Sequence, residues 1–258
     1  MIIWLTSYPK SGNTWVRAFL GNYLSSNLEN PIDNIGRIKS FPKKKQFENI
    51  VEEEILKKDG LEIFKYFIEA QKKINENNKF HLIKTHNFYG SVKKSEFSNK
   101  ENTAGFIYIV RDPRSVAVSY AYHEDISFNK SIEQMFNENR IAINDKFYYE
   151  ARSSWKGHLL SWLGSPYPKL LIKYEDLKKN PFYNFKLIFY HQTNDKNLDK
   201  FNFTFKFFQF YLINHILKIK IYSPILTNVK KLYFKKLYFI PFVSKISFSK
   251  KKKISKIS

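Results

Sequence analysis

The chain begins Met1-Ile-Ile-Trp-Leu-Thr-Ser-Tyr-Pro-Lys-Ser-Gly-Asn-Thr-Trp15, and these residues predict the centre of the fold. Its apolar run, Ile2 to Leu5, predicts a buried strand. The small residues around Gly12 predict a tight turn. Asn13 or Thr14 is expected to cap a helix that continues with apolar residues at helical spacing. The stretch therefore predicts a strand, a tight turn and a helix in direct succession.

A turn between a strand and a helix is a common binding site for anions. Backbone N–H groups of the turn and the positive end of the helix point at one spot, and Lys10 adds a full positive charge. The GxxxxGK[ST] spacing of the usual phosphate loop is absent from this stretch. A second anchor elsewhere in the chain is therefore needed to specify the ligand.

Further apolar runs repeat the alternation of strand and helix. Strands are predicted at 80–85, 102–111 and 169–174, and helices at 46–77, from 112 onward, across 131–163 and after 174. Because strands alternate with helices, we expect an α/β fold. Its centre should be a parallel sheet flanked by helices on both faces, in a three-layer sandwich.

Four polar residues lie at or just past the ends of the predicted strands: Lys10, His86, Arg111 and Tyr174. In open parallel sheets, ligands bind beyond the carboxyl ends of the strands. Four polar residues at equivalent ends are stronger evidence for a ligand site than any one of them. The sequence therefore predicts that residues far apart in the chain form one site at this edge.

Several stretches together resemble the sulfotransferases that use 3′-phosphoadenylyl sulfate (PAPS), in particular the cytosolic type. Thr6–Trp15 resembles the 5′-phosphosulfate loop of that family, and Ile109–His123 resembles its 3′-phosphate segment. Lys84-Thr-His86 resembles the segment that carries the catalytic base, and Tyr174–Leu177 resembles a further signature. The resemblance covers roughly residues 1–190 and implies a fold like that of the P-loop nucleotide hydrolases.

Sulfuryl transfer is an in-line displacement at sulfur, analogous to phosphoryl transfer. It requires stabilisation of the leaving phosphate and removal of a proton from the acceptor. Lys10 suits the first task and His86 the second, while Lys84 either supports the leaving group or pairs with a surface acid. A sulfuryl group carries less charge than a phosphoryl group, and the histidines show no ligand spacing such as HExxH, so we expect no metal.

The resemblance also implies a set of residues that bind the donor: Ser11, Gly12, Asn13, Thr14, Trp15, Arg111, Ser119 and Tyr174. Backbone N–H groups of the turn would hold the 5′-phosphate, and Arg111 with Ser119 would hold the 3′-phosphate. Trp15 and Tyr174 would contact the adenine.

Structural roles compete with these assignments. His86 can close a strand through a backbone hydrogen bond, Arg111 can form a salt bridge with a nearby acid, and Trp15 can belong to the core.

Charge is distributed unevenly along the chain, whose formal net charge is +21. Residues 1–200 hold 31 Lys and Arg against 23 Asp and Glu, whereas residues 201–258 hold 13 Lys and no acid. We therefore expect a sulfotransferase domain at 1–200 and an atypical basic, aromatic tail at 201–258. The tail lacks the Arg-Lys-Gly segment with which the family closes its donor site. Three interpretations remain open: an altered or poorly ordered end, weak contact with a membrane surface, or a divergent end that supplies lysines to the 3′-phosphate.

The expected function is transfer of a sulfuryl group from PAPS to a hydroxyl, or an amine, of a small molecule or glycan. The alternatives are an inactive nucleotide-binding pseudoenzyme without the C-terminal 3′-phosphate loop, a P-loop-like nucleotide kinase, and a basic nucleic-acid binder. The missing GK[ST] disfavours the kinase, and no nucleic-acid-binding motif is visible.

The chain has no cysteine, which fits a reducing compartment, and no run of about 18 apolar residues. We therefore expect a cytoplasmic protein without a transmembrane segment.

Overall fold

A computed structural model describes residues 1–25, 33–52, 54, 59–77, 79–144 and 147–193. The expected tail at 201–258, and with it the expected domain boundary at 200, lie outside the described residues. Within the described residues, no helix combines the length and the apolar composition that a membrane span requires.

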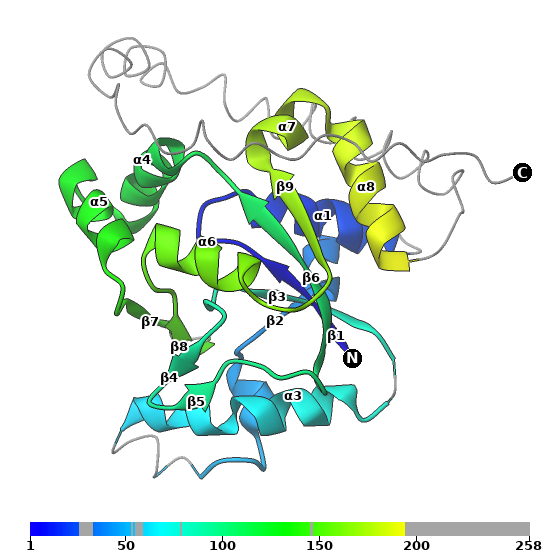
Figure 1. Cartoon of the computed structure of the whole chain (residues 1–258), viewed down its shortest axis with the longest axis vertical. Coiled ribbons are helices and arrows are strands. Elements are labelled where there is room, and N and C mark those ends of the chain that lie inside the picture. The colour runs from blue at the N-terminus through cyan, green and yellow to red at the C-terminus, as the bar shows by residue number, and fades with distance from the viewer. Residues whose placement is uncertain (26–32, 53, 55–58, 78, 145–146, 194–258) are drawn as a thin grey trace, which may run out of the picture. The chain divides into compact units, whose positions relative to one another are not determined.

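Five parallel strands form the central sheet, in the order β2-β3-β1-β6-β9 (Figure 1). The strands are β1 (Ile2–Thr6), β2 (Lys39–Ser40), β3 (His81–Thr85), β6 (Thr103–Val110) and β9 (Lys169–Lys173). The strand that opens the chain lies in the middle, with Leu5 opposite Lys84 of β3 and Thr6 opposite Tyr108 of β6. The predicted α/β fold with a parallel sheet is confirmed.

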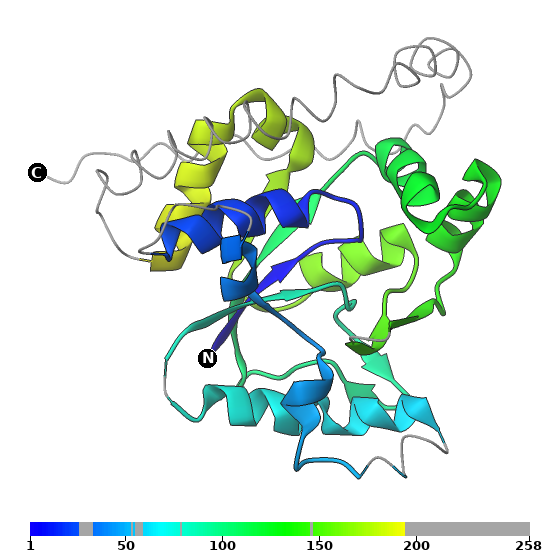
Figure 2. The ribbon, with the colours of Figure 1, turned by 180° about the vertical axis from the view of Figure 1, so that it is seen from behind.

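Helices cover both faces of this sheet. The principal helices are α1 (Asn13–Tyr23), α3 (Phe67–Asn75), α4 (Pro113–Glu124), α5 (Phe128–Phe136), α6 (Trp155–Leu163), α7 (Tyr174–Lys179) and α8 (Pro181–Thr193). Short 3₁₀ helices span Asp33–Arg37 (η1), Lys44–Phe47 (η2) and Gly60–Tyr66 (η3). In the two opposite views, α1 and α6 lie on opposite sides of the sheet (Figure 2). The layers are therefore helix, sheet and helix.

Strand side chains alternate between these two helical layers. On one face, Trp4 and Phe106 belong to a buried cluster with Phe67 of α3 and Trp162 of α6. The rings of Phe106 and Trp162 lie 5.0 Å apart, centroid to centroid. On the other side of the fold, α1 packs on α8 through a stacked pair, Phe19 and Phe185, at 4.1 Å. Aromatic side chains thus pack on both sides of the sheet.

The segment 131–163 is organised differently from the expected loose helical region. It contains the end of α5, a β-hairpin of β7 (Ile141–Asn144) and β8 (Phe147–Ala151), and then α6. The backbone of Ala151 explains the difference, because its N–H donates to Asn87 Oδ1 at 2.8 Å and its C=O accepts from Phe88 N–H. These partners lie more than 60 residues earlier in the chain. Local periodicity could not reveal them, and tertiary contacts decide the strand.

The expected helical region 46–77 is also only partly confirmed. Its second half forms η3 and α3, with the Asp59 side chain capping η3 by accepting from Leu61 N–H at 2.9 Å. Residues 48–52 form turns and bends rather than a helix. By contrast, the predicted start of the helix after β6 is confirmed, since Asp112 caps α4 by accepting from Arg114 N–H.

Candidate active site

The turn after β1 is closed by two residues with left-handed backbone conformations. Lys10 has φ 67° and Gly12 has φ 101°. Gly12 is the N-cap of α1, so the expected cap by Asn13 or Thr14 is wrong. Asn13 is instead the first helical residue, and its side chain reaches back to Leu5 O and Ser7 Oγ, each at 3.3 Å. The amide thus ties the start of α1 to the end of β1.

Tyr174 packs directly against Gly12. A Cβ added to Gly12 would lie 2.4 Å from Tyr174 Cδ2, which is closer than real Cβ atoms approach. The first residue of α7 therefore touches the turn after β1, although the two are far apart in sequence. A glycine is required at position 12 both by its positive φ and by this contact.

Gly12→Ala is expected to destabilise the chain by about 1–2 kcal/mol or more, since the left-handed strain is compounded by the clash with Tyr174. The free energy of unfolding from urea titration measures this loss. Gly36→Ala is the matched control, because no atom lies within 4 Å of a Cβ added there and its φ is not positive. Equal stability of the two variants would contradict the tight contact.

Arg111 joins the end of β6 to the same turn. Its Nη1 donates to the Lys10 carbonyl oxygen at 2.8 Å, and its guanidinium lies 4.6 Å from the centre of the Tyr174 ring. The expected alternative of a salt bridge is not seen among the described residues, where the neighbouring Asp112 pairs with Arg114. The ends of β1, β6 and β9 are therefore connected through one arginine.

Two cations thus lie together at the edge of the sheet. Burial lowers the pKa of the half-buried Lys10 amine, with the charge of Arg111 acting in the same direction and that of Glu124 opposing it. Because like charges repel, a site that holds both cations is best stabilised by a bound anion.

Several buried polar atoms at this turn have no hydrogen-bond partner among the described residues. They are Ser11 Oγ, Asn13 Oδ1, Trp15 Nε1 and Arg111 Nε. Buried polar groups in native proteins are nearly always paired, so unpaired groups call for an explanation such as a ligand. Three of these four groups can donate, which suits the acceptor-rich oxygens of a phosphate. The residues at the turn therefore fit a phosphorylated ligand.

Trp15 lies between the candidate site and the core. Its ring meets Tyr174 edge-on at 6.1 Å and Phe185 of α8 at 5.8 Å. Thr14 is exposed at the start of α1, and Ser119 is half-buried in the second turn of α4. Within the described residues, no side-chain hydrogen bond or ion pair connects Thr14 or Ser119 to the residues that cluster around the turn. The structure thus brings together most of the expected donor-binding residues, with these two at the margin.

His86 follows β3 and binds the same turn from the other side. Its Nδ1 lies 2.7 Å from the carbonyl oxygen of Ser7. A carbonyl can only accept, so Nδ1 carries the hydrogen and Nε2 carries the lone pair. Burial, with the charges of Lys84 and Arg152, holds the pKa of His86 well below its ordinary value of 6.5. The expected backbone hydrogen bond therefore exists, and it leaves a neutral ring with a basic Nε2.

Lys84 has a buried acid as its partner rather than the surface acid that the sequence suggested. Its Nζ lies 3.6 Å from Glu150 Oε1, and Arg152 Nη2 lies 2.9 Å from Glu150 Oε2. Burial alone would raise the pKa of Glu150, but the two cations outweigh it and lower that pKa. The β7–β8 hairpin thus supplies a carboxylate next to the candidate catalytic segment. The sequence does contain one indication of this carboxylate, because Glu150 is a single acidic residue within the aromatic stretch Phe147–Ala151.

Glu150→Gln is expected to lower the free energy of unfolding by about 3 kcal/mol at pH 7, because two buried cations lose their counter-charge. The effect depends on pH with a definite sign. The pKa of Glu150 is depressed in the folded state, so its contribution is present above its ordinary value of 4.5 and is lost as pH falls through the folded pKa. Urea titrations of both proteins at pH 7 and at successively lower pH measure this difference.

Glu133→Gln is the matched control for this variant, because Glu133 pairs with Lys130 on the exposed side of α5. No measurable change in stability is expected there. A Glu150→Gln variant as stable as this control would contradict the buried pairing.

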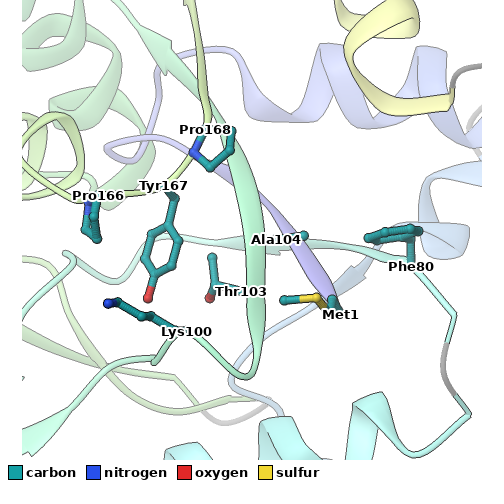
Figure 3. A pocket seen from close by; sticks show the side chains of 8 residues that line it. All are labelled: Met1, Phe80, Lys100, Thr103, Ala104, Pro166, Tyr167 and Pro168. Carbon is teal, nitrogen blue, oxygen red and sulfur yellow. The ribbon is translucent and has the colours of Figure 1, made fainter.

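A shallow, open pocket lies elsewhere. It measures about 390 Å³ and is lined by Met1, Phe80, Lys100, Thr103, Ala104, Pro166, Tyr167 and Pro168 (Figure 3). Met1 precedes β1, Thr103 begins β6 and Pro168 precedes β9, so the pocket is at the amino ends of the strands. The candidate active site is at their carboxyl ends, on the opposite edge of the sheet.

Comparisons with known proteins agree with the α/β fold of this chain. A family model described as "Sulfotransferase domain" matches residues 2–199. Sulfotransferase 1B1 of Canis lupus familiaris is 28% identical over 188 residues, which are 69% of this chain and 54% of that protein. Sulfotransferase 1B1 of Mus musculus is 31% identical over 202 residues, which are 76% of this chain and 59% of that protein. The chain thus spans little more than half the length of these curated relatives.

Among solved structures, the chain is similar to mouse sulfotransferase SULT7A1 complexed with PAP. That similarity covers 78% of this chain and 61% of that chain, at 20% identity and a TM-score of 0.48.

The parallel sheet and the cluster at its carboxyl edge define an α/β protein with a candidate anion site. The family match over residues 2–199 identifies it further: the chain belongs to the sulfotransferase domain family.

Proposed function

We propose that this protein transfers a sulfuryl group from PAPS to a hydroxyl, or an amine, of an acceptor molecule. The observation that carries the proposal is the hydrogen bond from Arg111 Nη1 to the Lys10 carbonyl. It joins the two motifs whose counterparts bind the two phosphorylated ends of the donor, and His86 binds the adjoining Ser7 carbonyl. Anion-binding groups and a base therefore meet at one turn.

The donor supplies the sulfuryl group, and the chain supplies the groups that bind it. The turn residues Ser11 to Thr14 would hold the 5′-phosphate, which the unpaired Ser11 Oγ supports. Arg111, with its unpaired Nε, and Ser119 of α4 would hold the 3′-phosphate. Trp15 and Tyr174, whose rings meet edge-on, would contact the adenine.

Three residues would carry the chemistry. His86 would accept the acceptor's proton at Nε2, because its Nδ1 is already occupied by the Ser7 carbonyl. Lys10 would stabilise negative charge on the leaving phosphate. Lys84, held by Glu150, would add a second positive charge close to the base. The depressed pKa of His86 supports this assignment, since a base must be unprotonated before it can accept a proton.

The direct test is an assay of sulfuryl transfer with isotope-labelled PAPS and a panel of phenols, aliphatic alcohols, amines and oligosaccharides. The proposal predicts label in one acceptor class of small molecules or glycans, without added metal. Label that moves only from the γ-phosphate of ATP would support the nucleotide kinase instead. We place the reaction in the cytoplasm as part of the same proposal.

A second candidate function is nucleotide binding without turnover. It is favoured by the sequence of residues 201–258, which contains no arginine or glycine and so lacks the Arg-Lys-Gly segment expected after a domain at 1–200. If an altered tail replaced that segment, binding of adenosine 3′,5′-bisphosphate (PAP) should be weak. A low-micromolar dissociation constant for the full chain would contradict the altered-tail interpretation. Absence of co-sedimentation with anionic vesicles would remove the membrane-surface interpretation.

A further inference from the structure

A chain of hydrogen bonds runs from the turn into the interior. The Ser7 carbonyl accepts from His86 Nδ1. His158 Nε2 lies 3.2 Å from the His86 carbonyl oxygen, and His158 Nδ1 lies 2.8 Å from the Tyr108 hydroxyl. The chain thus connects Tyr108 of β6 to the turn after β1 through two histidines.

The hydrogens in this chain have only one consistent arrangement. The His86 carbonyl can only accept, so His158 Nε2 carries a hydrogen and Nδ1 has the lone pair. Tyr108 must then donate its O–H to His158 Nδ1. Each of the two histidines thus donates one hydrogen bond and accepts another. A buried chain of paired groups of this kind favours one geometry.

Tyr108 and His158 of this hydrogen-bond chain, and the neighbouring Tyr8, lie in the interior of the protein. Tyr8 and Tyr108 are each only 1% exposed, and His158 is completely buried. Burial lowers the pKa of His158 to about 3, so its ring is neutral and retains the lone pair that Tyr108 needs. The His158 ring also meets Tyr8 edge-on at 5.7 Å. Packing and hydrogen bonding therefore fix the same side chains.

We propose that Tyr108 and His158 are positioning residues, which hold the backbone of His86 so that Nε2 of His86 stays aimed at the acceptor. This inference rests on the proposed function only in naming His86 as the base. Tyr108 and His158 are buried and are not among the residues assigned to the donor or the acceptor. Their effect is to couple the turn that binds the donor to the residue that removes the proton, and neither residue belongs to a motif that the sequence identified.

The test uses variants that keep the volume of each side chain. Tyr108→Phe removes only the hydroxyl, and His158→Phe keeps a ring without nitrogens. Each is expected to lower kcat about 10–100-fold, because a misplaced base costs rate even when it is chemically intact. The dissociation constant of PAP should change less than about threefold, since the groups assigned to the phosphates remain. His158→Gln, which has both a donor and an acceptor, should recover part of the lost kcat.

Tyr167→Phe is the matched control. Tyr167 is also a buried tyrosine, 7% exposed, whose hydroxyl accepts from the Tyr89 hydroxyl at 3.1 Å. It lies at the amino edge of the sheet, in the pocket of Figure 3. Loss of a buried tyrosine hydroxyl is thus reproduced away from the candidate active site, and kcat should be unaffected.

A spectroscopic measurement separates this inference from the proposed function. Long-range ¹H–¹⁵N spectra of the full chain identify which ring nitrogen of each histidine carries hydrogen. The wild type should have hydrogen on Nδ1 of His86 and on Nε2 of His158. Tyr108→Phe should give a mixture of His86 tautomers, whereas Tyr167→Phe should not.

The outcomes can be read independently. Hydrogen on the other nitrogen of either histidine in the wild type would overturn the hydrogen-bond chain without any variant. An unchanged His86 spectrum in Tyr108→Phe would do the same, even if kcat fell. Failure of the wild type to transfer a sulfuryl group would overturn the proposed function, while the spectra would still decide whether the hydrogen-bond chain exists.

Discussion

His86→Ala is expected to lower kcat for sulfuryl transfer by about 10²–10⁴-fold, the usual contribution of a positioned general base. The dissociation constant of PAP should remain nearly unchanged, because His86 contacts the donor turn only through the Ser7 carbonyl. Steady-state kinetics with labelled PAPS, together with calorimetric titration of PAP, measure the two quantities separately. The separation identifies His86 with chemistry rather than with binding.

His81→Ala provides the control on the same strand. His81 begins β3 and binds Asn77 at 2.8 Å, at the amino end of the sheet and away from the site. Its removal should leave both kcat and PAP binding as in the wild type. Equal turnover in His86→Ala and His81→Ala would contradict the assignment of His86 as the base.

Arg111→Ala is expected to have the opposite signature, with PAP binding weakened by about 100-fold or more. Truncating one partner of a buried, hydrogen-bonded charge contact costs about 2–5 kcal/mol, and each 1.4 kcal/mol is tenfold in the dissociation constant. The variant also lacks the hydrogen bond from Arg111 to the Lys10 carbonyl and the contact of the guanidinium with the Tyr174 ring. Arg111→Lys should recover little, because an ammonium group has no planar fork.

Arg114→Ala is the matched control for this prediction. Arg114 stands three residues later in the same motif, but it is exposed and pairs with Asp112 rather than with the turn. Its removal should change PAP binding less than about threefold. If Arg114→Ala and Arg111→Ala weakened binding equally, general positive charge rather than a specific contact would explain the affinity.

Much of the fold was predictable from the sequence. The strands that form the middle of the sheet have continuous apolar runs, such as Ile2–Leu5 and the run ending at Val110, because both of their faces are buried. Where such a run ends in a turn signal, the next polar residue lies at the carboxyl edge of the sheet. That reasoning placed Lys10, His86 and Arg111 in one neighbourhood, and their contacts through Ser7 and Lys10 confirm the neighbourhood.

The remaining parts of the candidate site depend on contacts between residues far apart in the chain. The hairpin β7–β8 is stabilised by Asn87, and its Glu150 reaches Lys84 on a different strand. No local pattern encodes such a pair. The N-cap of α1 was missed for a related reason, since Gly12 is required by the approach of Tyr174 rather than by helix capping.

Tyr108 and His158 illustrate the same limit in the interior. A tyrosine within an apolar strand and a lone histidine on a helix are ordinary core residues by sequence criteria. The role proposed for them emerges only from the geometry that connects both to the backbone of His86. Residues that position a catalytic group through buried hydrogen bonds are therefore the part of a site that sequence reasoning is least able to find.

In the proposed function, the turn after β1 and the end of β6 together form one site for a nucleotide with both a 3′- and a 5′-phosphate. Calorimetric titration of the full chain with PAP, adenosine 5′-monophosphate and ATP, without added metal, measures whether both phosphates contribute to binding. We expect PAP to bind at least about tenfold more tightly than adenosine 5′-monophosphate, because only PAP carries both the 5′-phosphate proposed for the Lys10 turn and the 3′-phosphate proposed for Arg111. Equal affinities for these two ligands, or tighter binding of ATP, would contradict this proposal.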